Sequence, residues 1–192
     1  MSFSYCLSVL SKRAKFLAFT NLLFFGGIFV AVVVSEWMLP PPLYLDRPRL
    51  FSRAIFGGDF FVEVFGIFVF NLGLSALAFV TLPGFAFFPL SIIVLLYRAF
   101  MWGVLLYHVP NWIFLLSMPT IILEGEGYVL AAVAGTLVGV SWIKPEWIHY
   151  EKSLSRRESL SRSLRECLAI YVFVIVLLFV GAIVEAMTLM MI

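Results

Sequence analysis

The hydrophobic residues of this 192-residue chain fall into long runs that are separated by short polar segments. A helix that crosses a membrane needs about 20 mainly apolar residues. Five runs meet this requirement, and we expect them to be spans: residues 16–39, 60–81, 87–107, 120–142 and 168–190. The first run is longer than the core of a signal peptide and lacks a typical cleavage site, so we interpret it as an uncleaved span. The pattern predicts an all-α, polytopic membrane protein in which residues 1–192 form one domain.

The fourth apolar region is longer than a membrane requires. As one straight helix, residues 111–142 would be roughly 48 Å long, whereas the hydrocarbon core of a bilayer is about 30 Å thick. Pro119 lies inside this region, and we expect the helix to break there because proline lacks the N–H that a helix interior needs. A short interfacial or re-entrant helix at 111–118 would then precede the fourth span.

Two polar segments lie between the spans. Residues 143–166, which contain KPEWIHYEKSLSRRESLSRSLR, are expected to form a cytoplasmic loop with a helix that enters the last span. The alternative is a segment that binds anionic lipid head groups or a cytosolic partner. Between the first two spans, the segment PRLFSRAIFGGDF (48–60) predicts an amphipathic helix at the membrane surface, with its arginines toward the head groups.

The basic residues predict the orientation, because cytoplasmic loops are enriched in Lys and Arg. With the N-terminus inside, nine basic residues are cytoplasmic: Lys12, Arg13, Lys15, Lys144, Lys152, Arg156, Arg157, Arg162 and Arg165. Three lie in the outer loop: Arg47, Arg49 and Arg53. We therefore expect a multi-pass protein of the cell membrane with a cytoplasmic N-terminus and an external C-terminus.

Composition supports the assignment to the membrane and narrows the chemistry. The chain is 63% hydrophobic and 12% charged, whereas a soluble domain is about 45–50% apolar and about 25% charged. Cys6 and Cys167 both fall in segments assigned to the cytoplasmic side, where thiols stay reduced, so we expect no disulfide. Two cysteines alone make no metal site, and we expect no metal, no cofactor and no nucleic-acid partner.

A few polar residues interrupt the apolar runs. They are Glu63, Asn71, Arg98, Glu124, Glu126 and Glu185. Ionisable groups within spans are rare and usually face the bundle interior or a water-filled cavity. In the predicted orientation the four glutamates lie near the outer ends of their spans, with His108 just above them and Arg98 nearer the middle. We therefore predict an outer layer of carboxylates.

Helical geometry then indicates which faces pack together. At about 100° per residue, Glu124 shares a face with Ala131, Gly135 and Gly139, and Gly127 lies beside them. Gly181 shares a face with Glu185 on the last span. Small residues let helices approach closely, so we expect the fourth and fifth spans to pack with the two carboxyl groups between them.

Charge inside this predicted interface must be neutralised. Glu124 and Glu185 would share a proton, or a cation would lie beside them, and Arg98 is the candidate cation. Glu126 points about 200° away from Glu124, so we expect it to be exposed or interfacial. The alternative for the whole cluster is a hydrogen-bonded network that only fixes helix pairing.

The same residues carry a family resemblance. Pro119, Glu124 and, eleven residues later, Gly135 have the spacing of a Pro-His-Gly-x-x-Glu segment and its following glycine in the stage II sporulation protein M family. The chain also resembles that family in Asn71, within FVFNLGLSAL, and in Glu185, within GAIVEAM. Thr120 and Ile121 stand where the family has His and Gly, so a role that depends on that His does not carry over. The resemblance implies a five-span membrane fold and a scaffold role, similar to sporulation members that assemble with cell-wall hydrolases.

Three functions can be weighed. The first is a noncatalytic membrane scaffold or subunit, with a protein partner or further copies of the chain as its partners in the lipid bilayer. The second is a small transporter or channel component whose outer carboxylates bind a proton or cation. The third, an intramembrane enzyme, is the weakest, because His108 and His149 fall on opposite sides of the membrane and no catalytic motif is present. A water-accessible cavity at Glu124 and Glu185 would favour transport, and a packed pair would favour the scaffold.

Overall fold

A computed structural model of the chain describes residues 2–40, 59–148 and 154–191. The described elements, all of them helices, are α1 (Phe3–Lys12), α2 (Ala14–Met38), α4 (Phe60–Val69), the π-helix η1 (Phe70–Thr81), α5 (Leu82–Ala86), α6 (Pro89–Tyr107), α7 (Asn111–Ile143), the 3₁₀ turn η2 (Pro145–Trp147) and α8 (Arg156–Met191). Within these residues, five helical stretches are long and apolar enough to cross a membrane: α2, the stretch Phe60–Ala86, α6, α7 and α8. The predicted all-α, five-span architecture is confirmed.

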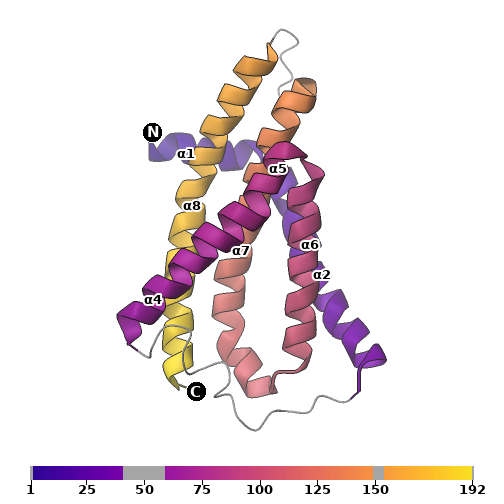
Figure 1. Ribbon diagram of the computed structural model, residues 1–192, viewed down its shortest axis with the longest axis vertical. Coiled ribbons are helices and arrows are strands. Elements are labelled where there is room, and N and C mark those ends of the chain that lie inside the picture. The colour runs from indigo at the N-terminus through magenta and orange to yellow at the C-terminus, as the bar shows by residue number, and fades with distance from the viewer. Residues whose placement is uncertain (1, 41–58, 149–153, 192) are drawn as a thin grey trace.

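α7 lies at the centre of the bundle, in contact with α8, η1, α5, α6 and α2 (Figure 1). Each of its residues from Gly127 to Ser141 is buried. A helix that is apolar on all sides is stable only when other helices surround it. The sequence of this stretch, GYVLAAVAGTLVGVS, has that character. α7 is therefore the core around which the other spans pack.

Pro119 does not end a helix, so the predicted separate helix at 111–118 is wrong. Those residues are the first turns of α7, which continues through the proline. The ribbon of α7 changes direction in its first turns (Figure 1), as expected for a proline that removes one hydrogen bond from a helix interior. Because the proline is followed by a long buried stretch, packing of the rest of α7 keeps the helix intact on both sides of it.

The polar helix predicted to enter the last span is present, and it is continuous with that span as α8. A capping box, in which Ser155 and Glu158 hydrogen-bond to each other, lies at the start of α8. The Ser155 hydroxyl accepts from the Glu158 N–H at 3.3 Å, and the Glu158 carboxylate accepts from the Ser155 N–H at 2.9 Å. His149 and Lys152 lie outside the described residues. So do Arg47, Arg49, Arg53 and most of the surface helix predicted at 48–60, of which only the end is described, with Asp59 capping α4.

Two of the elements that were not predicted contribute to the packing of the bundle. The first is α1, a short helix that lies across α8 (Figure 1). It buries Cys6 and Val9, and its Phe3 ring lies 6.0 Å from the ring of Phe173 on α8. The second is η1, which was not predicted because π-helices are rare, usually a single turn, and have no simple sequence pattern. η1 brings Asn71 to the face of the second span that meets α7.

Candidate functional site

The central contact inside the bundle joins Glu124 of α7 to Asn71 of η1. The Asn71 Nδ2 donates to Glu124 Oε1 at 2.5 Å, and both side chains are buried, with 6% and 5% of their surface exposed. A hydrogen bond between an amide and a carboxyl group in such surroundings is strong, and leaving either partner unpaired is costly. This pair fixes the rotation of α7 relative to the second span.

Glu185 of α8 reaches the same carboxyl group from the other side. The Glu124 and Glu185 side chains are neighbours and act electrostatically on each other; that they share a proton stays a prediction. Gly181, one turn earlier on α8, lies against Glu124, since a Cβ at this glycine would be 3.1 Å from Glu124 Cγ. The structure thus places α7 and α8 side by side with the two carboxyl groups between them. Glu63 of α4 is buried and acts electrostatically on Glu185.

Of the two expectations for Glu126, exposed or interfacial, the structure excludes the first. Glu126 is half-buried and faces α2, where Asn21 Nδ2 donates to its Oε2 at 3.3 Å. Asn21 is the site residue that the sequence reasoning missed. The available signal was that it is an uncharged amide within a long apolar run, the same signal that singled out Asn71. α7 is thus held by two asparagine–glutamate contacts, one to α2 and one to η1.

Arg98 and Glu124, both described residues, form no ion pair, but the Arg98 charge acts electrostatically on the Glu124 carboxyl group. The Arg98 guanidinium lies over the aromatic ring of Tyr128 on α7, with Cζ 3.8 Å from the ring centroid, and it is 5.6 Å from the ring of Trp102. Such a cation–π contact stabilises a cation away from water. The Tyr128 hydroxyl is buried beside Ser75 without a hydrogen bond of good geometry.

The term polar cluster is used below for these residues: Asn21, Glu63, Asn71, Arg98, Glu124, Glu126 and Glu185. All five long helices contribute to it. Arg98 is at the middle of α6 and Asn21 is in the first third of α2. That the carboxylates form an outer layer in the membrane stays a prediction. His108 does not belong to the polar cluster, since its ring Nδ1 pairs with the Val104 carbonyl at 2.9 Å.

The small residues of α7 serve two different interfaces. Gly127 meets α8, where a Cβ would lie 2.7 Å from Leu178 Cδ2. Gly135 and Gly139 face the second span and its turn instead. A Cβ at Gly135 would lie 2.7 Å from the Thr81 carbonyl oxygen, and a Cβ at Gly139 would overlap the carbonyl oxygen of Gly84. In the same region, the Ala131 carbonyl accepts from the Thr81 hydroxyl at 2.9 Å.

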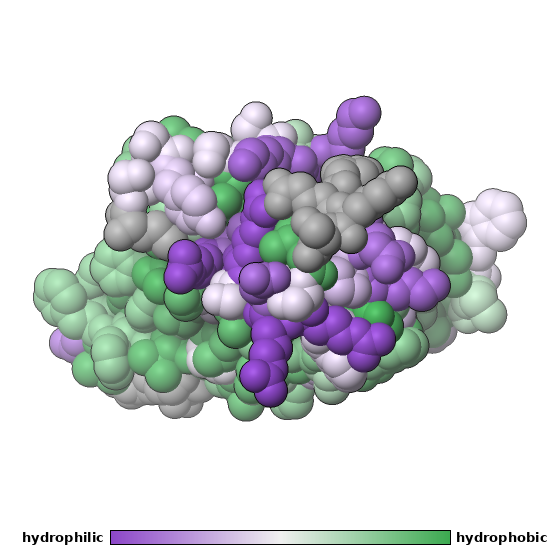
Figure 2. Space-filling view, turned by 90° about the horizontal axis from the view of Figure 1, so that it is seen from above, coloured by the Kyte–Doolittle hydropathy of each residue, from purple (hydrophilic) through white to green (hydrophobic). Residues whose placement is uncertain are grey.

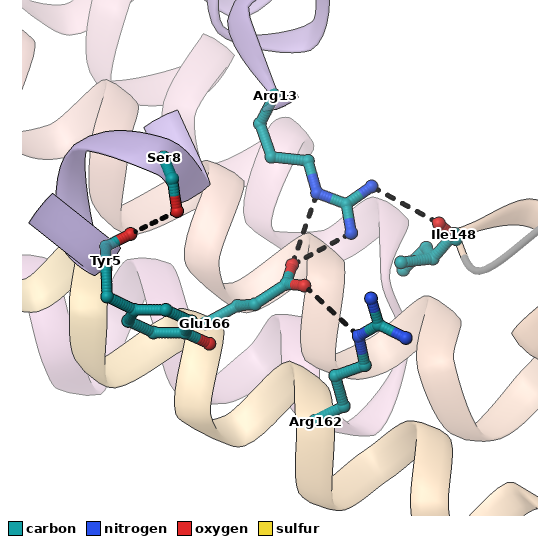
Figure 3. Close-up of polar contacts among 6 residues, drawn as sticks. All are labelled: Tyr5, Ser8, Arg13, Ile148, Arg162 and Glu166. Carbon is teal, nitrogen blue, oxygen red and sulfur yellow. Dashed lines mark hydrogen bonds and ion pairs between the residues drawn. The ribbon is translucent and has the colours of Figure 1, made fainter. Parts of the chain in front are cut away.

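A second group of charges ties the start of α2 to α8 (Figure 3). Arg13 donates to Glu166 Oε2 from Nη2 at 2.8 Å and from Nε at 3.2 Å, and its Nη1 reaches the Ile148 carbonyl at 3.4 Å. Arg162 Nε lies 3.8 Å from the other oxygen of Glu166. Arg13 and Glu166 are 153 residues apart in the chain, so no sequence pattern indicates that they are neighbours.

In the described part of the chain, no group of three or more His, Cys, Asp or Glu side chains has the arrangement of a metal site. Cys6 and Cys167 are both buried as free thiols. The polar cluster connects helices, with hydrogen bonds from η1 and α2 to α7 and with Glu124 of α7 packed against Gly181 of α8.

The family described as stage II sporulation protein M has a sequence model that matches residues 18–188 of this chain. The matched range contains every residue of the polar cluster, together with Pro119 and Gly135. No curated protein and no solved structure matches the chain.

Proposed function

Because this chain belongs to the stage II sporulation protein M family, we propose that it is a noncatalytic subunit of the membrane that assembles with partner proteins. The observation that carries the proposal is the closed packing of the polar cluster. Glu124 is 5% exposed, accepts a hydrogen bond from Asn71 and has Gly181 against its side chain. A carboxyl group held in this way locks helices together.

Transport through the bundle would need a different arrangement. An ion or proton path requires polar groups that face a water-filled cavity. Here the helix that carries Glu124 is buried from Gly127 to Ser141. Glycines at its contacts with the second span and with α8 bring the backbones close together. Both features support a rigid body that presents its outer surface to partners.

The test of assembly is co-purification. The tagged chain, expressed at native level and extracted in a mild detergent, should retain a protein in fixed proportion or form a defined oligomer. A five-span membrane protein of similar size, expressed and purified in the same way, is the control. Recovery of a lone monomer with no protein enriched over this control would contradict the proposal.

The test against transport uses proteoliposomes loaded with a pH-sensitive or cation-sensitive dye. We expect proton and cation flux no greater than in empty liposomes, both for the natural chain and for Glu124→Gln. Flux that Glu124→Gln abolishes would replace the scaffold with a transporter.

A further inference from the structure

A pocket of about 330 Å³ lies where α7 ends and α8 begins. Three charged side chains line it: Lys144, Glu146 and Arg156. Its apolar lining includes Ile143, Trp147 and Leu154. The polar cluster is elsewhere in the bundle, so the structure has a second candidate site that the proposed function does not use.

Aromatic residues place this pocket at the surface of the membrane. Trp142 donates from Nε1 to the Phe85 carbonyl at 2.7 Å, and the Trp147 ring lies 6.1 Å from the ring of Phe88. Both tryptophans are exposed although they pack on the turn between α5 and α6. Exposed tryptophans at the ends of spans mark the level of the lipid head groups. Figure 2 looks onto this end and shows hydrophilic side chains gathered at its centre, with apolar surface around them.

The charges of the pocket suit a phosphate. Lys144 and Arg156 are cations on opposite sides of the connection between α7 and α8, and among the described lining residues Glu146 supplies a carboxylate beside them. Lys144 is held in place, with Nζ 4.4 Å from the centroid of the Trp147 ring. Charge-assisted hydrogen bonds from Lys and Arg are the usual way in which proteins bind phosphate.

We propose that this pocket binds the phosphodiester of a phospholipid head group from the surrounding bilayer. Lys144 and Arg156 hold the phosphate oxygens, and Glu146 accepts hydrogen bonds from the amine or hydroxyl groups of the head group. Trp142 and Phe87, which are 41% and 51% exposed, offer apolar surface to the acyl chains. That surface distinguishes a lipid from free phosphate, because free phosphate has the same anionic oxygens but no acyl chains to contact it.

The experiment compares two double variants in detergent by native mass spectrometry, with added phosphatidylglycerol or phosphatidylethanolamine. Lys144→Gln/Arg156→Gln removes both pocket cations. Lys12→Gln/Arg157→Gln removes the same charge from the same end of the molecule, at exposed residues that do not line the pocket. We expect the first variant to lose bound phospholipid about tenfold or more and the second to retain it. Lys144→Arg/Arg156→Lys should also retain it, with circular dichroism confirming the fold of each variant.

Inorganic phosphate is the second arm. We expect millimolar phosphate to leave the phospholipid in place. Displacement by phosphate at that concentration would make the pocket a site for a soluble anion and overturn the lipid assignment. Equal lipid loss in the two glutamine variants would show that the general charge of this end, and not the pocket, attracts the lipid.

Discussion

At the scale of single residues, the polar cluster depends on pairing. Each glutamate at its centre on α7 has an asparagine partner on a different helix, Asn71 for Glu124 and Asn21 for Glu126. Inside a membrane no water is available to replace a lost partner, so an unpaired polar group there is expensive. The cost of a substitution should therefore follow the partner that is left behind more than the charge that is removed.

Substitutions of Glu124 test whether the cost follows the partner that is left unpaired. Glu124→Ala should lower the free energy of unfolding by about 2–4 kcal/mol, because it leaves the Asn71 amide unpaired and opens a cavity beside Gly181. Glu124→Gln/Glu185→Gln keeps the volume and the hydrogen-bonding groups, so the double glutamine variant should be less disruptive than the single alanine. Unfolding in detergent micelles, followed by circular dichroism, measures both. An equal loss in all variants would mean that the two carboxyl groups do not act as a pair.

Glu158 offers a pH-dependent test outside the membrane. Hydrogen bonds from the Ser155 hydroxyl, and then from its backbone N–H, hold the pKa of Glu158 below its ordinary value of 4.5. Because the pKa is lowered in the folded chain, the cap contributes most above 4.5, and its contribution is lost as the pH falls through the folded-state pKa.

In Ser155→Ala the pKa of Glu158 should rise toward 4.5, as measured by carbon NMR of labelled glutamate in micelles. Ser161→Ala, an exposed serine on the same helix, should leave that pKa unchanged. A Glu158 pKa that is the same in Ser155→Ala as in the natural chain would exclude the cap as its cause.

At the scale of helices, the spans could be predicted from the sequence because crossing a membrane demands long apolar runs. The partners of each helix face could not. Gly135 and Gly139 share a face with Glu124 in an ideal helix, yet they meet the second span while Glu185 comes from α8. Pro119 gave a strong local signal for a break, but the packing of the buried stretch that follows it maintained the helix. Asn21 and Arg13 were visible in the sequence, but their partners are distant in the chain and became apparent only in three dimensions.

The glycines of α7 and η1 give a matched pair of substitutions. A Cβ at Gly139 would overlap the backbone of Gly84, and neither backbone has room to move. Gly73, on η1, has nothing within 4 Å of the position of a Cβ. Gly139→Ala should therefore cost about 1–3 kcal/mol of stability by overpacking, and Gly73→Ala should be neutral or stabilising by up to about 1 kcal/mol. Thermal unfolding in detergent measures both, and similar melting temperatures for the two variants would refute the close contact.

At the scale of the whole molecule, the two termini lie toward opposite ends of the bundle (Figure 1). The end near the N-terminus carries Arg13, Lys144 and Arg162 together with the start of α8. An excess of Lys and Arg on one side is what places that side in the cytoplasm. The cytoplasmic placement of this end stays a prediction.

Reporter fusions test that orientation. A reporter that is active only outside the cytoplasm should be active when it is fused after α8 and inactive when it is fused before α1. A reporter that works only in the cytoplasm should show the opposite pattern. Activity of the external reporter at the N-terminus would reverse the proposed topology.

α8 covers one side of Glu124, and this contact forms late in biosynthesis. α8 follows α7 along the chain, so it leaves the ribosome later. Until it enters the membrane, Gly127 and one side of the Glu124 carboxyl group have no helix against them. The packing around this carboxyl group is therefore complete only after the last span has been inserted. A chain truncated between α7 and α8 would leave one side of this carboxyl group without its covering helix, and an uncovered polar group is expensive in a membrane.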